Sequence, residues 1–304
     1  MTSQSYYQQT MQPWPEIACF GRSIRIKKSN LNIFCFDSGS TGSHGIVMLH
    51  GLGDEADTWR HVFVPLSEKH HVVALDLPGF GRSDKPNKDY TPKFFMNTIV
   101  ELIEQLEMKS VILMGNSLGG LLSHALAVNY PERITGLILV DGALLQLKPL
   151  RDMNFALMRI PLLGEWFYTN LRKNPEAAFN SLRTVYHDLD GLPKSDREFL
   201  YTRVNKRVWS DGQKRAYFST LRNLSSWVRD YQAHLPGQLA VLQTPTLIIR
   251  GESDNLFPEE NARGILKVQP KAVFHTIKGA KHLPHQEQPS KFLSIVNRWL
   301  NELQ

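Results

Sequence analysis

Short runs of apolar residues recur along the chain and alternate with segments of helical pattern. The main runs are continuous, which is typical of strands buried on both faces of a sheet. They lie at residues 45–49, 71–75, 111–114, 137–140 and 247–249, with a weaker run at 272–276. Two earlier runs, at 24–27 and 33–36, alternate instead and predict a hairpin with its turn at 28–30. The pattern predicts an α/β fold, a mostly parallel, doubly wound sheet covered by helices.

Helical patterns fill the segments between these runs. Apolar residues at helical spacing predict amphipathic helices around residues 99–106 and 292–300. Residues 118–130 are apolar on nearly every side, which predicts a buried helix that ends before Pro131.

One region interrupts the alternation. Residues 146–236 contain no apolar strand run, so we expect a helical cap inserted between two core segments, 1–145 and 237–304. Residues 148–235 hold 15 Lys and Arg against 9 Asp and Glu, which accounts for the whole net charge of +6. Two expectations follow for this charge: it biases substrate choice toward anions, or it faces water, as the pairs Lys206-Arg207 and Lys214-Arg215 would.

Composition excludes several classes of protein. Of 304 residues, 42% are hydrophobic and 21% charged, which argues against a disordered or collagen-like chain. A net charge of +6 is mild for this length and indicates no nucleic-acid partner. Two cysteines, Cys19 and Cys35, exclude a disulfide scaffold and are expected to be small buried hydrophobes.

The sequence also bears on the compartment. No apolar run approaches the roughly 18 residues that a membrane span needs, so no transmembrane segment is predicted. The N-terminal stretch lacks a charged start followed by an apolar run, so it is not expected to be a secretory signal. We therefore expect a cytoplasmic protein, and peripheral membrane contact through the basic cap is not favoured.

A glycine-rich turn carries the strongest chemical signal. It reads Gly-Asn-Ser-Leu-Gly-Gly over residues 115–120, between a predicted strand and the predicted buried helix, and so fits the G-x-S-x-G pattern in its meaningful context. Such a tight turn needs small residues around Ser117, whose hydroxyl would project at the carboxyl end of the sheet. The helix that follows offers free amide hydrogens to a developing oxyanion.

Further segments follow other predicted strands. His-Gly-Leu-Gly at residues 50–53 comes where a second oxyanion amide, that of Leu52, would be needed beside that of Leu118. Asp-Leu-Pro-Gly-Phe-Gly-Arg-Ser follows the next strand. Asp254 closes the sequence Gly-Glu-Ser-Asp, and His282 closes Gly-Ala-Lys-His. A serine, an acid and a histidine in this order at strand ends fit the chain order of one hydrolase architecture.

These motifs together resemble the α/β-hydrolase fold superfamily, in its branch with a helical cap, over about residues 20–145 and 240–304. The resemblance implies that Ser117 is the nucleophile, Asp254 the acid and His282 the base of a catalytic triad. It also implies an oxyanion hole formed by the backbone amides of Leu52 and Leu118. The chain lacks the HGGG form of many lipase-like members, and a serine nucleophile disfavours haloalkane dehalogenases and epoxide hydrolases.

Alternatives remain for the two partners of the serine. His285 is the main rival of His282 as the base. Asp141, after the run at 137–140, is the main rival acid, and Glu252 is a weaker one. Structural roles, as core or loop-holding residues, are expected for His50, His124, Asp76 and Arg82.

We expect a cofactor-free serine hydrolase that cleaves a small, hydrophobic carboxylic ester through an acyl-enzyme. The same triad serves hydrolases of carbon–carbon bonds and haloperoxidase-like enzymes, and a non-catalytic ligand-binding protein of the same fold is the alternative from another class. No residue spacing predicts a metal site or a nucleotide cofactor. The candidates for lining the substrate pocket are the cap residues Trp166, Phe167 and Tyr168. The substrate itself and the oligomeric state stay open.

Overall fold

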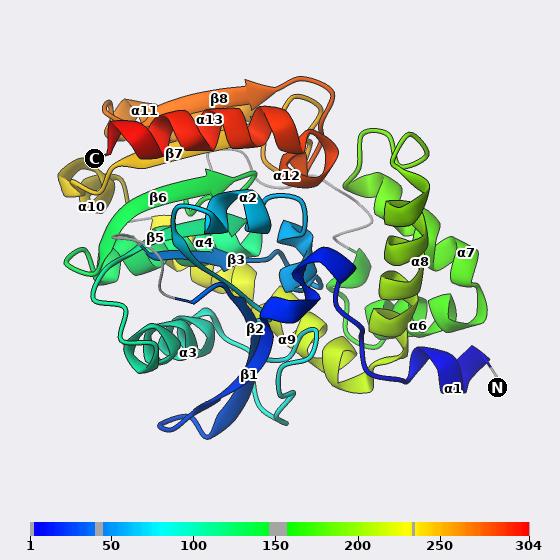
Figure 1. Cartoon of the computed structure of the whole chain (residues 1–304). Coiled ribbons are helices and arrows are strands. Elements are labelled where there is room, and N and C mark those ends of the chain that lie inside the picture. The colour runs from blue at the N-terminus through cyan, green and yellow to red at the C-terminus, as the bar shows by residue number, and fades with distance from the viewer. Residues whose placement is uncertain (1–2, 40–44, 146–156, 233–234, 304) are drawn as a thin grey trace.

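The computed structural model describes residues 3–39, 45–145, 157–232 and 235–303 (Figure 1). Within them, one eight-stranded sheet has the strand order β1-β2-β4-β3-β5-β6-β7-β8. The β1–β2 and β2–β4 pairs are antiparallel, and all other pairs are parallel. The strands are β1 (Gly21–Ile26), β2 (Leu31–Asp37), β3 (Gly45–Leu49), β4 (His71–Leu75), β5 (Val111–Asn116), β6 (Ile134–Val140), β7 (Thr246–Gly251) and β8 (Val273–Ile277).

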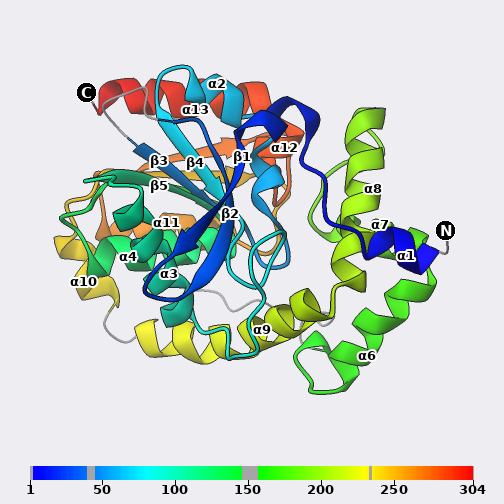
Figure 2. The same ribbon diagram turned by 60° about the horizontal axis from the view of Figure 1, so that its bottom comes forward.

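Helices cover both faces of this sheet, as the continuous apolar runs predicted. Val47 and Leu49 of β3 belong to the core of one face, whereas Ile46 and Met48 belong to the core of the other. Figure 2 shows the two helical layers on either side of the strands. The first face is covered by α3 (Pro92–Gln105), α4 (Leu118–Asn129), α10 (Leu235–Val241) and α11 (Glu259–Val268), and the second by η1 (Pro15–Phe20), α2 (Phe63–Ser67) and α13 (Pro289–Glu302).

Element boundaries follow local sequence signals. The runs predicted at 45–49 and 71–75 are β3 and β4 to the residue, and the buried helix begins at Leu118 as expected. The helix predicted around 99–106 begins earlier, at Pro92, because Thr91 caps it: its side chain accepts the N–H of Phe94 at 3.2 Å. The N-terminal hairpin is longer than predicted, and Asn30 takes the left-handed conformation in its turn, with φ of 56°.

A helical insert follows β6 and precedes β7. The part of it that the structure describes contains no strand and consists of α6 (Leu163–Asn170), η3 (Leu171–Lys173), α7 (Pro175–Asn180), η4 (Ser181–Thr184), α8 (Lys194–Trp209) and α9 (Asp211–Gln232). In Figure 1 the arrowheads of β6 and β8 point toward the side on which α6, α7 and α8 lie. The insert therefore stands at the carboxyl ends of the strands.

The boundaries predicted for this insert can be compared only in part. Its expected start at residue 146 lies outside the described residues. Its expected end, at residue 236, falls within α10, and both Leu235 and Leu239 of that helix pack into the sheet core. The N-terminal helix α1 (Ser3–Tyr7) lies beside α7 and α8 in both views (Figures 1 and 2).

The two cysteines differ from each other. Burial in β2 raises the pKa of the Cys35 thiol to about 12, as suits a small core residue. Cys19 is exposed, so the expectation that both are buried is wrong for it. The reason is that η1 turns Ile17 into the core and leaves Cys19 on its outer side. None of the described helices is both long and apolar enough to cross a membrane.

Candidate active site

Ser117 occupies the turn between β5 and α4, with φ of 53° and ψ of −115°. A residue with a Cβ is strained in such a conformation, and strain of this kind concentrates at functional sites. The neighbouring backbone leaves no space for larger residues. A Cβ on Gly115 would lie 2.2 Å from the carbonyl oxygen of Gly119, and a Cβ on Gly119 would lie 2.2 Å from that of Leu49. The glycine pattern around the serine thus has a steric cause.

The His-Gly-Leu-Gly segment forms a turn against this serine. A Cβ on Gly51 would lie 3.2 Å from the Cβ of Ser117. The turn closes where the N–H of Asp54 donates to the carbonyl of Gly51 at 3.3 Å. Leu118 is the first residue of α4, so its N–H has no acceptor within the helix. The amides of Leu52 and Leu118 thus come from two backbone segments that adjoin Ser117.

His282 and Asp254 are hydrogen-bonded to each other in the interior. Nδ1 of His282 lies 3.0 Å from Oδ2 of Asp254, and the two side chains are 7% and 0% exposed. Burial alone would raise the pKa of Asp254, but the charge and the hydrogen bond of His282 outweigh it, so the pKa is lowered. A carboxylate at Nδ1 leaves Nε2 as the free ring nitrogen.

The backbone of His282 is held from two sides. The side-chain amide of Asn116 donates to the carbonyl of His282 at 3.0 Å and to that of Val140 at 3.2 Å. The N–H of His282 donates to the carbonyl of Val185 in the helical insert, also at 3.0 Å. The sequence did not single out Asn116, because the G-x-S-x-G pattern leaves its second position open. The residue before the serine thereby ties β5 to the histidine loop.

Asp141, the rival acid, lies in the same buried site. It directly follows β6 with φ of 47°, and its two oxygens accept the N–H of Gly251 at 3.0 and 3.2 Å. Burial and the negative charge of Asp254 raise the pKa of Asp141 well above its usual range, which favours a protonated carboxyl hydrogen-bonded to Asp254. The two acids thus differ: the pKa of Asp254 beside His282 is lowered, and the pKa of Asp141 is raised.

Asp141, Asp254 and His282 are also the group of side chains, among the described residues, that lie close enough together to bind a metal ion. One ligand atom each of Asp141, Asp254 and His282 lies within 4.8 Å of the others. Their mutual hydrogen bonds already occupy these atoms, so a metal would have to displace the contact between Asp254 and His282.

The rival base His285 is a core residue. It is fully buried, its Nε2 is 3.0 Å from Oγ1 of Thr58, and its ring lies 4.3 Å from that of Trp59. Burial and the positive charge of Arg60 hold the pKa of His285 well below its usual range. This ring is therefore neutral and does not contact either aspartate of the site.

The remaining candidates have the structural roles that were expected of them. His50 is hydrogen-bonded to the backbone of residues 51 and 77, at 2.7 and 2.9 Å. His124 is buried in α4, where burial lowers its pKa to about 4. Arg82 Nε donates to Asp76 at 2.8 Å and holds the loop after β4. Glu252, the weaker rival acid, is exposed, unlike the buried pair of Asp254 and His282.

The three aromatic candidates of the insert face different ways. Trp166 and Phe167 are 59% and 44% exposed and contact each other edge to face at the surface. Tyr168 turns inward and lies 5.6 Å from the ring of Tyr217 on α9, measured between ring centroids. Tyr217 in turn packs on Gly53, where a Cβ would lie 3.1 Å from its ring. The sequence did not indicate Tyr217, yet it connects the insert to the turn beside Ser117.

The four cations that the sequence analysis singled out in the insert differ in their surroundings. Lys206 is 6% exposed and donates to the backbone carbonyl of Thr10 at 2.9 Å, and Arg207 bonds Glu55 at 2.7 Å. Lys214 contacts Asp211 at 3.3 Å, and Arg215 donates to a backbone carbonyl of the core. The expectation that these residues face water is wrong for Lys206 and Arg207, which acidic and carbonyl groups of neighbouring segments enclose, whereas Arg215 is exposed as expected and Lys214 is half-buried.

The chain belongs to the alpha/beta hydrolase fold family, whose sequence profile matches residues 46–289. Among curated proteins, it is 27% identical over 271 residues to YugF of Bacillus subtilis, named an uncharacterized hydrolase, covering 87% of this chain and 93% of that one. It is 26% identical over 292 residues to mouse epoxide hydrolase 4, covering 92% and 79%. The fold also matches CumD, a meta-cleavage product hydrolase of Pseudomonas fluorescens, with a TM-score of 0.76, 23% identity and coverage of 94% and 99%.

Proposed function

We propose that this hydrolase-family protein is a serine hydrolase of carboxylic esters that works through an acyl-enzyme and needs no cofactor. In this proposal Ser117 is the nucleophile, His282 the general base and Asp254 the acid that orients it. The backbone amides of Leu52 and Leu118 form the oxyanion hole. The observation that carries the proposal is the buried hydrogen bond between Asp254 and His282, at the same sheet edge as the strained turn of Ser117.

The chemistry needs these groups in these states. A serine hydroxyl becomes a useful nucleophile when a base removes its proton, and Nε2 of a neutral imidazole does so near neutral pH. The ester carbonyl carbon bonds to the serine oxygen, and the carbonyl oxygen takes up negative charge beside the two amides. The imidazolium then protonates the leaving alcohol, and water hydrolyses the acyl-enzyme by the same steps. The carboxylate of Asp254 stabilises the imidazolium and fixes its orientation.

The helical insert is proposed to be a cap that covers Ser117 and selects the substrate. Two contacts support this: Val185 binds the backbone of His282, and Tyr217 packs on Gly53. Tyr168 continues this aromatic chain, so we propose Tyr168 and Tyr217 as lining residues for a hydrophobic acyl group. Trp166 and Phe167 contribute to the pocket only if the cap changes its position, because both are exposed in this structure.

A second candidate function uses the same groups. The fold likeness to CumD keeps cleavage of a carbon–carbon bond in an activated diketone as the alternative within the class. Peracid formation and ligand binding without turnover are two further candidate functions. None of these needs a different set of side chains, so substrate tests have to separate them.

The decisive experiment combines covalent labelling with a substrate series. The purified protein is treated with a fluorophosphonate probe, and the tryptic peptide of residues 110–133 is fragmented, since it holds Ser110 and Ser123 besides Ser117. Rates are then measured for p-nitrophenyl esters of increasing chain length and for a vinylogous diketone. We expect the label on Ser117 and ester turnover that depends on chain length.

Other outcomes would redirect the assignment. A label on another serine contradicts the proposed nucleophile. Labelling of Ser117 with diketone cleavage far faster than ester cleavage favours the carbon–carbon hydrolase. Absence of both label and turnover, with tight binding of an apolar ligand, supports the binding protein.

A further inference from the structure

The oxyanion turn is continued by two acidic residues that the helical insert holds. We call residues 50–55 the oxyanion loop. Glu55 is 1% exposed, and Arg207 of α8 binds both its oxygens, with Nε 2.7 Å from Oε2 and Nη2 2.7 Å from Oε1. The same guanidinium also binds Asp54. This two-pronged contact is the geometry in which an arginine fixes the orientation of a carboxylate most strongly.

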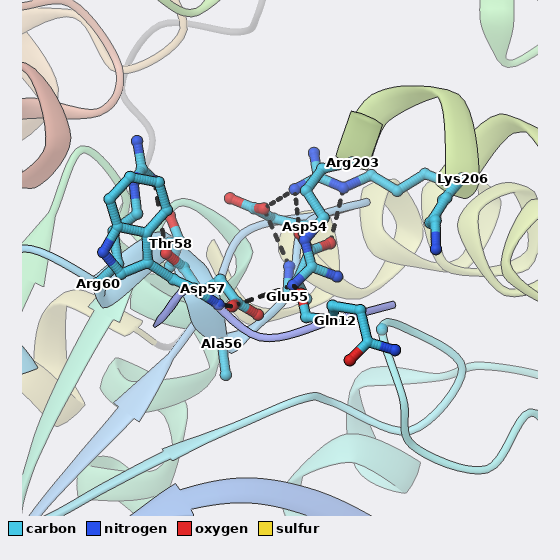
Figure 3. Close-up of polar contacts among 12 residues, drawn as sticks. Gln12, Asp54, Glu55, Ala56, Asp57, Thr58, Arg60, Arg203 and Lys206 are labelled. Carbon is cyan, nitrogen blue, oxygen red and sulfur yellow. Dashed lines mark hydrogen bonds and ion pairs between the residues drawn. The ribbon is translucent and has the colours of Figure 1, made fainter. Parts of the chain in front are cut away.

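A second arginine one turn earlier on α8 extends the contact. Arg203 is buried, with Nη2 3.0 Å from Oδ1 of Asp57, Nε 3.7 Å from Oε1 of Glu55, and a hydrogen bond to the carbonyl of Gln12 in the N-terminal arm. Figure 3 shows Arg203 of α8 beside the segment that carries Glu55 and Asp57; Asp57 lies just beyond the loop, in η2 (Ala56–Trp59). The charges of Arg207 and Arg203 outweigh the effect of burial and lower the pKa of Glu55. Glu55 is therefore ionised.

Helix α9 holds the middle of the same loop. Nε2 of Gln213 donates to the carbonyl of Gly53 at 3.2 Å, while its Oε1 accepts the N–H of Gly81 at 3.2 Å. Gly53 has φ of 82°, and the ring of Tyr217 packs against it. The insert thus contacts each of the three residues that directly follow Leu52.

Stability alone does not account for such an arrangement. Buried ion pairs are often no more stabilising than apolar residues of the same volume, because the desolvation of both charges opposes their attraction. A contact through two nitrogens of one guanidinium does, however, fix the position of the carboxylate that it binds. The stabilisation that an oxyanion donor gives depends on its placement, and loss of one donor costs roughly 10²- to 10³-fold in kcat.

We propose that Arg207 is a positioning residue: through its fork onto Glu55 and Asp54 it fixes the turn that directs the Leu52 amide at the substrate oxyanion. This inference rests on the proposed serine hydrolase function. It makes the insert part of the catalytic apparatus, because movement of α8 would release the oxyanion loop.

The test compares Arg207→Lys with a matched control, Arg60→Lys. Lysine keeps the charge but lacks the fork. Arg60 is equally part of a buried contact between the core and α8, with Nε 2.8 Å from Oδ1 of Asp196, but it does not contact residues 50–55. The stability of both variants is measured by urea unfolding, and their active sites are counted by complete fluorophosphonate labelling. Their kcat and KM are measured on a p-nitrophenyl ester. Inhibition is measured with an alkyl trifluoromethyl ketone, which forms an oxyanion with the serine.

We expect Arg207→Lys to lower kcat per labelled site by about 10²-fold with KM nearly unchanged, and to weaken ketone inhibition by a similar factor. Arg60→Lys should lose stability but keep its kcat per labelled site and its ketone inhibition. If Arg207→Lys does not fold, Glu55→Gln should show the same pattern, since it keeps the shape and removes the charge.

Three results would overturn the inference. The first is a loss of stability in Arg207→Lys or Glu55→Gln with kcat per labelled site unchanged. The second is an equal fall of kcat in Arg60→Lys. The third is a wild-type protein that neither labels nor hydrolyses esters, which refutes the proposed function itself and is recognised without any variant.

Discussion

Asp141 and Asp254 meet in one buried site although they follow different strands, and Asp141 accepts the N–H of Gly251 with both its oxygens, at 3.0 and 3.2 Å. Asp254 faces His282 at 3.0 Å. Burial and the charge of Asp254 raise the pKa of Asp141, which favours the protonated form of this second carboxyl. Asp141 is therefore a hydrogen-bond partner of Asp254, and Asp254 is the acid that is hydrogen-bonded to the imidazole of His282.

We expect Asp254→Asn to lose about 10³- to 10⁴-fold in kcat, because an amide at this position favours the wrong tautomer of His282. Asp141→Asn should lose less than about tenfold, since its amide still accepts the N–H of Gly251 and still donates to Asp254 as the protonated acid does. The measurement is kcat on a p-nitrophenyl ester. Reversed losses would show that the acid of the triad is Asp141.

Replacement of Ser117 should abolish ester turnover and leave the fold intact. We expect Ser117→Ala to lower kcat by several orders of magnitude, because only binding and the oxyanion hole remain. Its matched control is Ser123→Ala on α4, the helix that follows Ser117; Ser123 is a buried serine whose hydroxyl has no hydrogen-bond partner. A Ser117→Ala protein that retains more than about a tenth of the wild-type rate would refute the assignment.

The charge of the insert should have little effect on the choice between neutral and anionic substrates. Arg207 is paired with Glu55 and Arg203 with Asp57, and both acids belong to the core, so they offset part of the excess charge of the insert. We therefore expect the ratio of kcat/KM for matched neutral and anionic esters to change less than about twofold between low and high salt, because paired charges create a weak field at a distance. A ratio that falls steeply with salt would restore the steering role considered from composition alone.

Acid should destabilise the protein in part through His124. Burial lowers its pKa to about 4 from the usual 6.5, and its Nδ1 accepts the N–H of Leu144 at 3.4 Å, which suits a neutral ring. The unfolded chain binds this proton more readily, so the contribution of His124 to stability is present above pH 6.5 and is lost as the pH falls toward 4.

The amount lost between pH 7 and pH 4 is about 3 kcal/mol for a shift of this size. Urea unfolding of wild type and His124→Asn at both pH values measures it. We expect the variant to show a smaller decrease of the unfolding free energy by that amount. Equal decreases in the two proteins would mean that folding does not lower the pKa of His124.

The strands and the turn that holds Ser117 were determined by local sequence. A continuous apolar run reports burial on both faces, which is why β3 and β4 match their predicted bounds. Glycine is required at positions 115 and 119 because a Cβ there would lie 2.2 Å from a backbone oxygen, so the motif alone located the turn. The contact of Asp254 with His282 was anticipated only through the resemblance to the α/β-hydrolase fold superfamily.

Tertiary structure decided the different surroundings of two histidines that look alike in the sequence. His282 and His285 are three residues apart, yet one meets an aspartate and the other stacks on Trp59, because the short helix α12 (Pro284–Glu287) turns His285 into the core. No local pattern distinguishes them.

The same holds for the charged residues of the insert. Composition gave a charge of +6 and the two expectations of steering or solvation, whereas α8 directs Arg203 and Arg207 onto Glu55 and Asp57 of the core. Ion pairing joins groups about 150 residues apart in sequence, and its partners depend on how the helices pack. Local residue preferences therefore determined the sheet, the turn and the order of the site, and only packing over long sequence distances decided the hydrogen bonds and ion pairs that hold them.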